Sequence, residues 1–251
     1  MAENFNPFTL EGKKILVTGA SSGIGRGISV ACSKMGATVF INGRNEKRLM
    51  ETRFMCEPNH SESIVGDLTK IQDLCKLVEA LPKLDGVVHC AGIGDRTLCK
   101  MVHEDDVERV MNINFKAPVI LQAELLKQKK LNKGGSVVFV ASIASDSPSI
   151  GNALYSASKG AIISYAQCLQ LELAPRQIRV NCISPAMVWT DLVFKGGVTE
   201  EQLKEDEVKY PLKRYGKPED IANLAIYLLS DASIWMTGSN VKITGGGKLD
   251  Q

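Results

Sequence analysis

The stretch Thr18-Gly19-Ala20-Ser21-Ser22-Gly23-Ile24-Gly25 stands between two segments of different hydrophobic pattern. Before it, Ile15–Thr18 is apolar and rich in β-branched residues, which predicts a buried strand. After it, Ile24–Met35 has a helical period and stops at Gly36, a typical residue after a helix end. Such a turn lets the backbone approach a pyrophosphate, which the free N–H groups of the helix start attract. We therefore predict a nucleotide-binding turn, although its spacing is GxxxGxG and not the general GxGxxG.

Strands and helices are predicted to alternate along the whole chain. The apolar runs that indicate strands are Ile15–Thr18, Thr38–Ile41, Ser63–Val65, Gly86–Cys90, Ser136–Ser142, Arg179–Ile183 and Asn240–Ile243. The segments with helical period are Ile24–Met35, Glu46–Met55, Lys70–Leu81, Asp105–Lys130, Ala153–Leu173 and Pro218–Leu229. Pro118 lies inside the fourth of these helices, where we expect a kink or a junction. The alternation predicts an α/β fold: a Rossmann-type, doubly wound parallel sheet of about seven strands in a single domain, residues 1–251, with helices on both faces.

One long stretch, residues 186–215, has no clear period. It contains Gly196-Gly197 and the charged run Glu200–Glu207. We expect a flexible substrate flap here, and the alternative is an ordinary surface helix with loops.

Composition and charge exclude several classes of partner. The 251 residues carry 30 basic and 28 acidic side chains, a net charge of +2 that gives no footprint for nucleic acid or an anionic membrane. No apolar run approaches the roughly 20 residues of a membrane-spanning helix, and the start lacks the pattern of a secretory signal. Seven cysteines without a CxxC pair, and only three histidines, predict a reduced cytoplasmic protein with no metal site.

The end of the second predicted strand decides which dinucleotide fits. NAD sites place an acidic residue there, roughly 20 residues after the glycine turn, to hold the ribose 2′-hydroxyl. Here the strand ends Phe40-Ile41-Asn42-Gly43-Arg44, with no acid before Glu46. Arg44 can pair with a 2′-phosphate through two parallel hydrogen bonds, and Ser22 can add a hydroxyl donor. The pattern favours NADP(H) over NAD(H); the alternative is that Arg44 is a solvated loop residue.

A second set of residues suggests acid–base chemistry. Tyr155 and Lys159 are four residues apart at the start of a predicted helix, so their side chains share one face. An ammonium within ~4–6 Å of a phenol favours its ionised form, which makes a tyrosine a usable proton donor or acceptor. Ser142 ends a strand of buried type, where an α/β sheet presents side chains to a ligand. On its own, the Tyr-x-x-x-Lys pair favours an ordinary amphipathic helix face, and the context of Ser142 and the glycine turn changes that interpretation.

Taken together, these motifs identify a known family. From about Leu10 to Gly246, the sequence resembles the short-chain dehydrogenase/reductase family in its non-extended form. The family's TGxxxGxG turn matches residues 18–25, its catalytic serine Ser142, its YxxxK pair Tyr155 and Lys159, and its catalytic asparagine Asn114.

The resemblance implies roles for further positions. Asn114 would hold a water that relays protons to Lys159, and Lys159 would also bind the ribose of the nicotinamide. Asp67 would contact the adenine, although it also fits as the N-cap of the helix that follows. The implied cofactor-binding set is Gly19, Ser21, Ser22, Gly23, Ile24, Gly25, Arg44, Asp67, Leu68, Ala91, Gly92, Tyr155, Lys159, Pro185 and Thr190.

Two positions depart from the family pattern. The usual NNAG reads His89-Cys90-Ala91-Gly92, so an asparagine that braces the central strand is absent. We interpret His89 as a core or edge histidine and not as a catalyst. The usual Pro-Gly after the sixth strand reads Pro185-Ala186, and alanine would be strained if that site needed a positive φ.

The resemblance implies an NADPH-dependent reductase that turns a carbonyl into an alcohol, with Tyr155 as acid/base. In overall pattern the sequence is most similar to the 3-oxoacyl-[acyl-carrier-protein] reductases. Those enzymes dock an acidic carrier protein on basic residues, and Lys133 and Arg176 stand at comparable places here. Alternatives are an ordinary basic rim, a reductase or dehydrogenase of a sugar, steroid or small ketone, and a non-catalytic dinucleotide-binding protein. Relatives are mostly tetramers, so a homotetramer is expected.

Overall fold

In the computed structural model, which describes residues 6–147, 149–196 and 198–247, the chain folds around one parallel sheet of seven strands in the order β3-β2-β1-β4-β5-β6-β7. The strands are β1 (Lys14–Thr18), β2 (Thr38–Gly43), β3 (Ser61–Val65), β4 (Leu84–His89), β5 (Leu131–Val140), β6 (Arg179–Pro185) and β7 (Asn240–Ile243). Strand order reverses between β1 and β4, and ligands of open α/β sheets bind at such a point. The predicted doubly wound α/β fold is confirmed.

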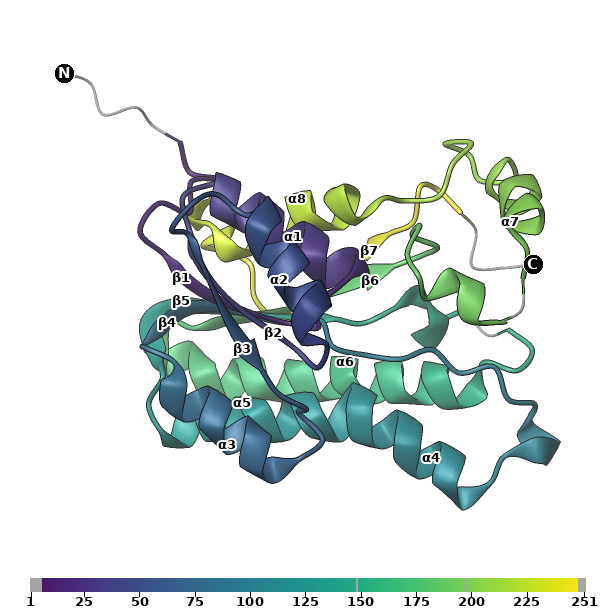
Figure 1. Cartoon of the computed structure of the whole chain (residues 1–251), viewed down its shortest axis with the longest axis horizontal. Helices are drawn as coiled ribbons and strands as arrows, with labels where there is room; N and C mark the ends of the chain where they lie inside the picture. The colour runs from purple at the N-terminus through teal and green to yellow at the C-terminus, as the bar shows by residue number, and fades with distance from the viewer. Residues whose placement is uncertain (1–5, 148, 197, 248–251) are drawn as a thin grey trace.

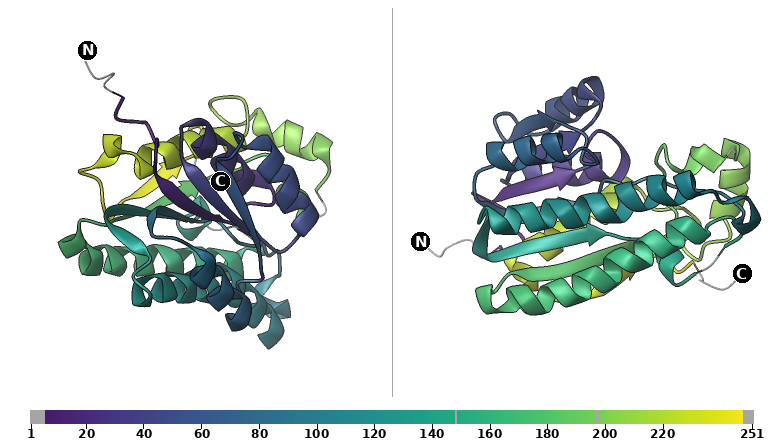
Figure 2. Two further views of the ribbon diagram at one scale, coloured as in Figure 1. Left: turned by 60° about the vertical axis from the view of Figure 1, so that its left-hand side comes forward. Right: turned by 90° about the horizontal axis from the view of Figure 1, so that it is seen from below.

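Helices cover both faces of this sheet (Figures 1 and 2). One layer contains α1 (Gly23–Lys34), α2 (Glu46–Met55) and α8 (Pro218–Leu229). The other layer contains α3 (Ile71–Ala80), α4 (Glu104–Met111), α5 (Ala117–Lys127) and α6 (Ala153–Leu173). Helix α7 (Glu200–Glu207) stands apart from both layers, at the right of Figure 1.

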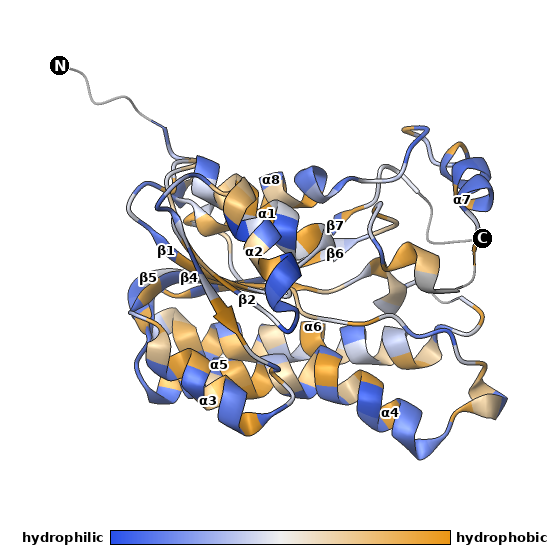
Figure 3. Ribbon diagram, in the orientation of Figure 1, coloured by the Kyte–Doolittle hydropathy of each residue, from blue (hydrophilic) through white to orange (hydrophobic). Residues whose placement is uncertain are grey.

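Each face of the sheet has its own hydrophobic core, because successive side chains of a strand point to opposite faces. On β1, Leu16 packs into the core beneath α3, α5 and α6, whereas Ile15 and Val17 pack into the core beneath α1, α2 and α8. All three side chains are fully buried. Figure 3 colours the strands mainly as hydrophobic and α7 mainly as hydrophilic, so α7 contributes little to either core.

The predicted helix Asp105–Lys130 is wrong as a single α-helix. The structure breaks it into α4 and α5, with a π-helical turn at Asn112–Lys116 between them. Pro118 explains the break, because it has no N–H to donate to the carbonyl of Asn114, four residues earlier. Isolated π-turns inside helices are frequent at functional sites, and this one carries Asn114.

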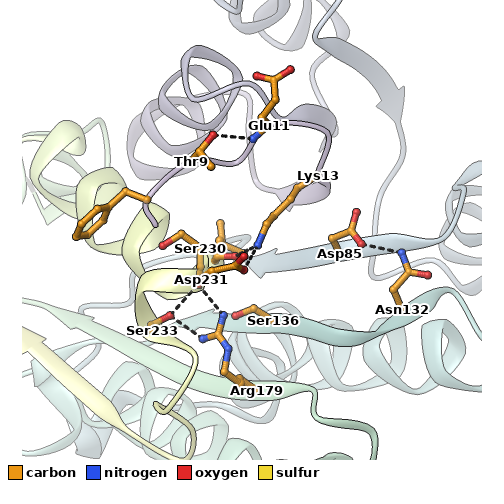
Figure 4. Close-up of polar contacts among 12 residues, drawn as sticks. Thr9, Glu11, Lys13, Asp85, Asn132, Ser136, Arg179, Ser230, Asp231 and Ser233 are labelled. Carbon is orange, nitrogen blue, oxygen red and sulfur yellow. Dashed lines mark hydrogen bonds and ion pairs between the residues drawn. The ribbon is translucent and has the colours of Figure 1, made fainter. Parts of the chain in front are cut away.

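Polar contacts hold helix α8 to the sheet at the amino ends of the strands (Figure 4). The buried Arg179 donates hydrogen bonds to the Ser233 hydroxyl at 2.8 Å and to the Ser230 carbonyl at 3.1 Å. Lys13 forms an ion pair with Asp231 at 2.6 Å. These contacts lie at the end of the sheet opposite the carboxyl ends of the strands, where ligands of open α/β sheets bind.

Two boundary differences affect the site. Strand β5 begins at Leu131 and ends at Val140, so Ser142 lies past the strand end and not within it. The predicted flap of residues 186–215, of which Gly197 lies outside the described residues, contains α7 and is closed at its base by a β-bridge between Val188 and Gly216. Its flexibility stays a prediction.

Candidate active site

A cleft of about 390 Å³ opens at the carboxyl ends of the strands, where the strand order reverses between β1 and β4. It is lined by every residue of the predicted cofactor-binding set: Gly19, Ser21, Ser22, Gly23, Ile24, Gly25, Arg44, Asp67, Leu68, Ala91, Gly92, Tyr155, Lys159, Pro185 and Thr190. Ser142 lines the same cleft. The fold therefore brings residues from the carboxyl ends of six strands, β1 to β6, and from the start of α6 to one surface.

The glycine turn is packed so closely that side chains would not fit. Gly19 has φ +66°, and a Cβ there would lie 2.7 Å from the Cα of Ala91. A Cβ on Gly25 would lie 2.4 Å from the carbonyl oxygen of Gly19. The residue before α1, Ser22, makes no side-chain cap bond, so the N–H groups of the first helical turn are left for another acceptor. This geometry suits a pyrophosphate.

One end of the cleft carries a loose ion pair. Arg44, at the end of β2, has its Nη1 4.0 Å from Oδ2 of Asp67, after β3. The Arg44 side chain is 62% exposed, so it is free to turn toward a phosphate. Burial raises the pKa of the Asp67 carboxyl, but the Thr69 N–H and hydroxyl, with the charge of Arg44, outweigh burial and bring that pKa below its ordinary value.

Asp67 is not a helix N-cap, which corrects one of the two readings given above. Its Oδ1 accepts hydrogen bonds from the Thr69 N–H at 3.0 Å and the Thr69 hydroxyl at 2.8 Å. Helix α3 begins at Ile71, four residues after Asp67, and no side chain caps it. Asp67 thus stabilises a turn ahead of the helix while lining the cleft.

The three predicted acid–base side chains meet at the other end of the cleft. The ammonium of Lys159 lies 5.7 Å from the centre of the Tyr155 ring and donates a 2.8 Å hydrogen bond to the Val140 carbonyl at the end of β5. Lys159 is buried, so its charge acts with little screening by water. Ser142 is buried, and its hydroxyl accepts a 3.1 Å bond from the Ala144 N–H. Its own proton is available to a substrate oxygen.

Asn114 does not line the cleft but lies directly behind it. Its amide donates to the Ile93 carbonyl at 2.9 Å and to the Ser158 hydroxyl at 3.0 Å, and accepts from the Ile93 N–H at 2.8 Å. A Cβ on Gly92 would lie 3.2 Å from the Asn114 oxygen and 3.5 Å from the Lys159 nitrogen. Asn114 therefore fixes the loop after β4 beside Lys159.

The two departures from the family pattern have different surroundings. His89 is buried, stacks on Phe139 at 4.5 Å and contacts the Gln122 oxygen through Nε2 at 3.0 Å, so it is a core residue as predicted. Burial lowers the pKa of His89 to about 4. Ala186 is not among the described residues with positive φ, and its N–H bonds the Ile243 carbonyl at 3.1 Å.

Cys90, the second departure in that motif, lines the cleft. Burial raises the pKa of its thiol to about 12, although the charge of Lys159 acts in the opposite direction. The thiol is therefore held neutral beside the lysine and adds no charge to the site.

Sequence reasoning missed several residues of the cleft, among them Arg48 from α2, and Asp191 and Leu192 after β6. Arg48 and Asp191 form an ion pair although they are 143 positions apart. No motif marks either residue. Their proximity depends on the loop after β6 crossing toward α2, which a single sequence does not reveal.

A separate basic cavity of about 470 Å³ lies at the amino end of β5. Its cationic lining residues are Lys83, Lys129, Lys133 and Arg176. Arg176 donates a hydrogen bond to the Leu131 carbonyl at 2.5 Å, which fixes its guanidinium at the rim. The predicted pair Lys133 and Arg176 is thus brought together, at the end of the sheet away from Tyr155.

The described ranges hold neither a metal cluster nor a membrane-spanning helix. No cluster of three or more His, Cys, Asp or Glu side chains suited to a metal ion was found there. Among the helices of the same residues, none has the length and apolar character needed to span a membrane.

The chain is similar in sequence to known proteins. A family model described as enoyl-(acyl carrier protein) reductase matches residues 19–248. The 3-oxoacyl-[acyl-carrier-protein] reductase FabG of Rickettsia felis is 36% identical over 237 residues, which is 94% of this chain and 97% of the relative. An L-xylulose reductase of Caenorhabditis elegans is 32% identical, covering 93% and 95%.

Solved structures are equally similar. A short-chain dehydrogenase/reductase from Brucella melitensis superposes with a TM-score of 0.87 at 30% identity, covering 94% of this chain and 96% of that one. A protein from Beutenbergia cavernae, described as a candidate NAD(P)-dependent gluconate 5-dehydrogenase with bound NADP at low occupancy, gives 0.85 at 29% identity, covering 96% and 98%.

Proposed function

The chain belongs to the short-chain dehydrogenase/reductase family, and we propose that it is an NADPH-dependent reductase that converts a carbonyl group into an alcohol. The observation that carries this proposal is the placement of Tyr155, Lys159 and Ser142 in the cleft that the glycine turn lines. The 3-oxoacyl thioesters named by relatives at 33–36% identity are the proposed substrates.

The residues of the cleft fit a dinucleotide phosphate. The approach of Gly19 to Ala91, too close for a side chain, leaves a backbone cradle for the pyrophosphate. Arg44 would exchange its 4.0 Å contact with Asp67 for the 2′-phosphate, which offers a bidentate partner of higher charge. Pro185 and Thr190 would hold the carboxamide, and Lys159 the adjoining ribose. When bound, the nicotinamide would supply the hydride that reaches the carbonyl carbon.

Side chains of this chain would transfer the proton to the substrate oxygen. Ser142 donates a hydrogen bond to the substrate oxygen and orients the carbonyl, while the Tyr155 hydroxyl gives its proton to that oxygen. The buried ammonium of Lys159 stabilises the phenolate that remains. The phenolate would regain a proton from Lys159, and a water held by Asn114 would in turn give a proton to Lys159. Charge would therefore develop only where a fixed cation faces it.

Delivery by an acyl carrier protein is supported by the basic cavity at Lys133 and Arg176, which suits an acidic partner. This cavity lies at the far end of α6, whose 21 residues correspond to about 30 Å. A carrier docked there would serve the active site of another copy. Two copies that pack α5 and α6 around a two-fold axis, antiparallel, would bring the cavity of one toward Tyr155 of the other.

A homotetramer is proposed on two features of the described chain. Strand β7 is at one edge of the sheet, and edge strands of this kind need cover. Beside it, Trp235 is 99% exposed and Ile234 is 76% exposed, an unusual pair of apolar side chains for a free surface. Light scattering of the purified chain tests the mass directly, and a monomer would contradict the proposal.

A substrate panel with NADPH tests the proposed activity. It compares a 3-oxoacyl thioester with a keto sugar and a small ketone, because L-xylulose reductase and gluconate dehydrogenases are among the relatives. An enoyl thioester is included because the family description names that reaction. We expect the 3-oxoacyl thioester to give the highest kcat/KM. Preference for a sugar would favour the alternative of a sugar reductase or dehydrogenase. If no substrate is turned over, a non-catalytic dinucleotide-binding protein is favoured.

A further inference from the structure

Three consecutive residues after β6 cross the mouth of the cleft. The Thr190 methyl group lies 3.0 Å from where a Cβ on Gly23 would be, so it rests on the glycine turn. Asp191 forms an ion pair with Arg48 of α2. Leu192 lies 3.3 Å from the Cβ position of Gly94, in the loop after β4. The segment Thr190–Leu192 therefore contacts three different walls of the cleft, and Asp191 supplies its charged contact.

Arg48 is the fixed member of the ion pair. Its N–H donates to the Asn45 side chain at 2.9 Å, which caps α2, and its carbonyl accepts from the Arg26 guanidinium at 3.2 Å. The same guanidinium donates to the Ser21 carbonyl at 2.7 Å. The backbone of Arg48 is thus tied to the glycine turn, whereas Asp191 lies in the loop after β6. The ion pair therefore holds the loop after β6 to α2 and the glycine turn.

The residue on the other side of Thr190 is also anchored. The Trp189 indole N–H donates to the Glu207 carboxylate at 2.9 Å, which ties Trp189 to the end of α7. Thr190 therefore stands between two tethered residues, Trp189 and Asp191. Loss of either tether would let the Thr190 side chain move relative to the glycine turn.

We propose that Arg48 is a positioning residue that acts through Asp191 to hold Thr190 over a bound dinucleotide. The inference rests on the proposed placement of the nicotinamide beside Thr190. Its consequence is slow release of the cofactor, because the segment must leave Arg48 before the dinucleotide can escape. Both dinucleotides share the nicotinamide half, so NADPH and NADH would be retained to the same degree.

A direct contact of Arg48 with the 2′-phosphate is the competing role, because Arg48 lines the cleft together with Arg44. The two roles predict different results. A phosphate contact would affect NADPH alone and would not need Asp191. A positioning role would affect both cofactors, would need Asp191 and would tolerate exchange of the two charges.

The experiment measures dissociation rates of NADPH and NADH from the full-length chain by stopped-flow fluorescence. The variants are Arg48→Ala, Asp191→Ala, the conservative Arg48→Lys and the charge exchange Arg48→Asp/Asp191→Arg. Lys47→Ala is the matched control, because Lys47 is an exposed cation on the same turn of α2 and does not line the cleft. Circular dichroism confirms folding of each variant.

The two side chains are 42% and 63% exposed, so the pair behaves as a surface ion pair and the effect is moderate. We expect each alanine variant to release both cofactors about two- to fivefold faster, with the cofactor KM raised and kcat kept. Arg48→Lys and the charge exchange would restore most of the wild-type rate, and Lys47→Ala would not change it. Because salt screens exposed charges, the difference would shrink at high ionic strength.

If the alanine variants bind both cofactors normally and release them at the wild-type rate, the role of Arg48 is overturned. The proposed function would still stand in that case. An effect confined to NADPH, or a charge exchange that restores nothing, would also overturn the role of Arg48. Failure of the wild-type chain to bind either dinucleotide would overturn this inference and the proposed function together.

Discussion

The ammonium of Lys159 lies 5.7 Å from the centre of the Tyr155 ring, one helical turn away on the same face of α6. It is fixed there by a 2.8 Å hydrogen bond to the carbonyl of Val140, the last residue of β5. The strand end and the helix start therefore set the distance between cation and phenol. Because the ammonium is buried, its field reaches the phenol with little loss to water.

Replacing Lys159 with alanine should remove both of its proposed contributions. We expect kcat to fall by about 10²- to 10⁴-fold, since the phenolate loses its stabilising cation, and NADPH to bind more weakly, since the ribose loses a donor. Steady-state kinetics and a fluorescence titration measure the two effects. Lys116→Ala provides a matched control in the same layer. Unchanged kcat in the Lys159 variant would contradict the assignment.

Arg44 should decide the choice of cofactor. We expect Arg44→Ala to weaken NADPH about 10- to 100-fold, the loss of a charge-assisted hydrogen bond, and to leave NADH nearly unchanged. Asp67→Asn should act in the opposite direction, because it removes the carboxylate that competes for Arg44 at 4.0 Å while keeping a polar side chain. Dissociation constants for the two cofactors test this pair. Equal weakening of NADPH and NADH by Arg44→Ala would exclude a phosphate contact.

Asn114 should affect stability and catalysis together. Its amide is the partner of both the N–H and the carbonyl of Ile93, so Asn114→Ala would leave two partly buried backbone groups without those bonds. We expect a loss of about 2–5 kcal/mol in the free energy of unfolding, and slower turnover in the protein that remains folded. Urea denaturation and kinetics at low temperature separate the two. A variant as stable as the wild type would show that Asn114 does not hold this loop.

His89 should make the protein less stable in mild acid. Its pKa is about 4 in the folded chain, against about 6.5 when unfolded, because burial disfavours the imidazolium. Between these values the unfolded chain binds the extra proton, so stability is lost as the pH falls from about 6.5 to about 4. The loss is roughly 3 kcal/mol. His89→Asn should flatten this part of the curve of unfolding free energy against pH. An unaltered slope would show that other groups cause it.

Much of the fold could be predicted because local pattern and global packing agree. Helices α2, α6 and α8 have the predicted bounds. The Asn45 side chain caps α2, and Pro218 is the first residue of α8, both of them typical start signals. The break at Asn112–Lys116 could not be placed, because Pro118 predicts a kink but not a π-turn ahead of it. Helix α7 did have a signal, the capping box of Thr199 and Gln202, which the charged composition of that segment obscured.

Some contacts of the site could be predicted from the sequence and others could not. Tyr155 and Lys159 share a helix, and the glycine turn is continuous in sequence. The relative placement of these residues can therefore be predicted from their short spacing. The pair Arg48 and Asp191 depends on where a long loop returns across the sheet, which no local rule determines. At Asp67 the sequence could not distinguish between roles, because a turn, a helix cap and a ligand contact all favour an aspartate.

The measurement that tests the central claim most directly is NADPH oxidation with a 3-oxoacyl thioester by the wild-type chain and by Tyr155→Phe. The substitution removes one hydroxyl and keeps the ring, so cofactor affinity should stay within about twofold while turnover falls by at least about 10²-fold. Retained turnover in the variant, with NADPH bound as tightly as before, would show that another group protonates the substrate and would contradict the account.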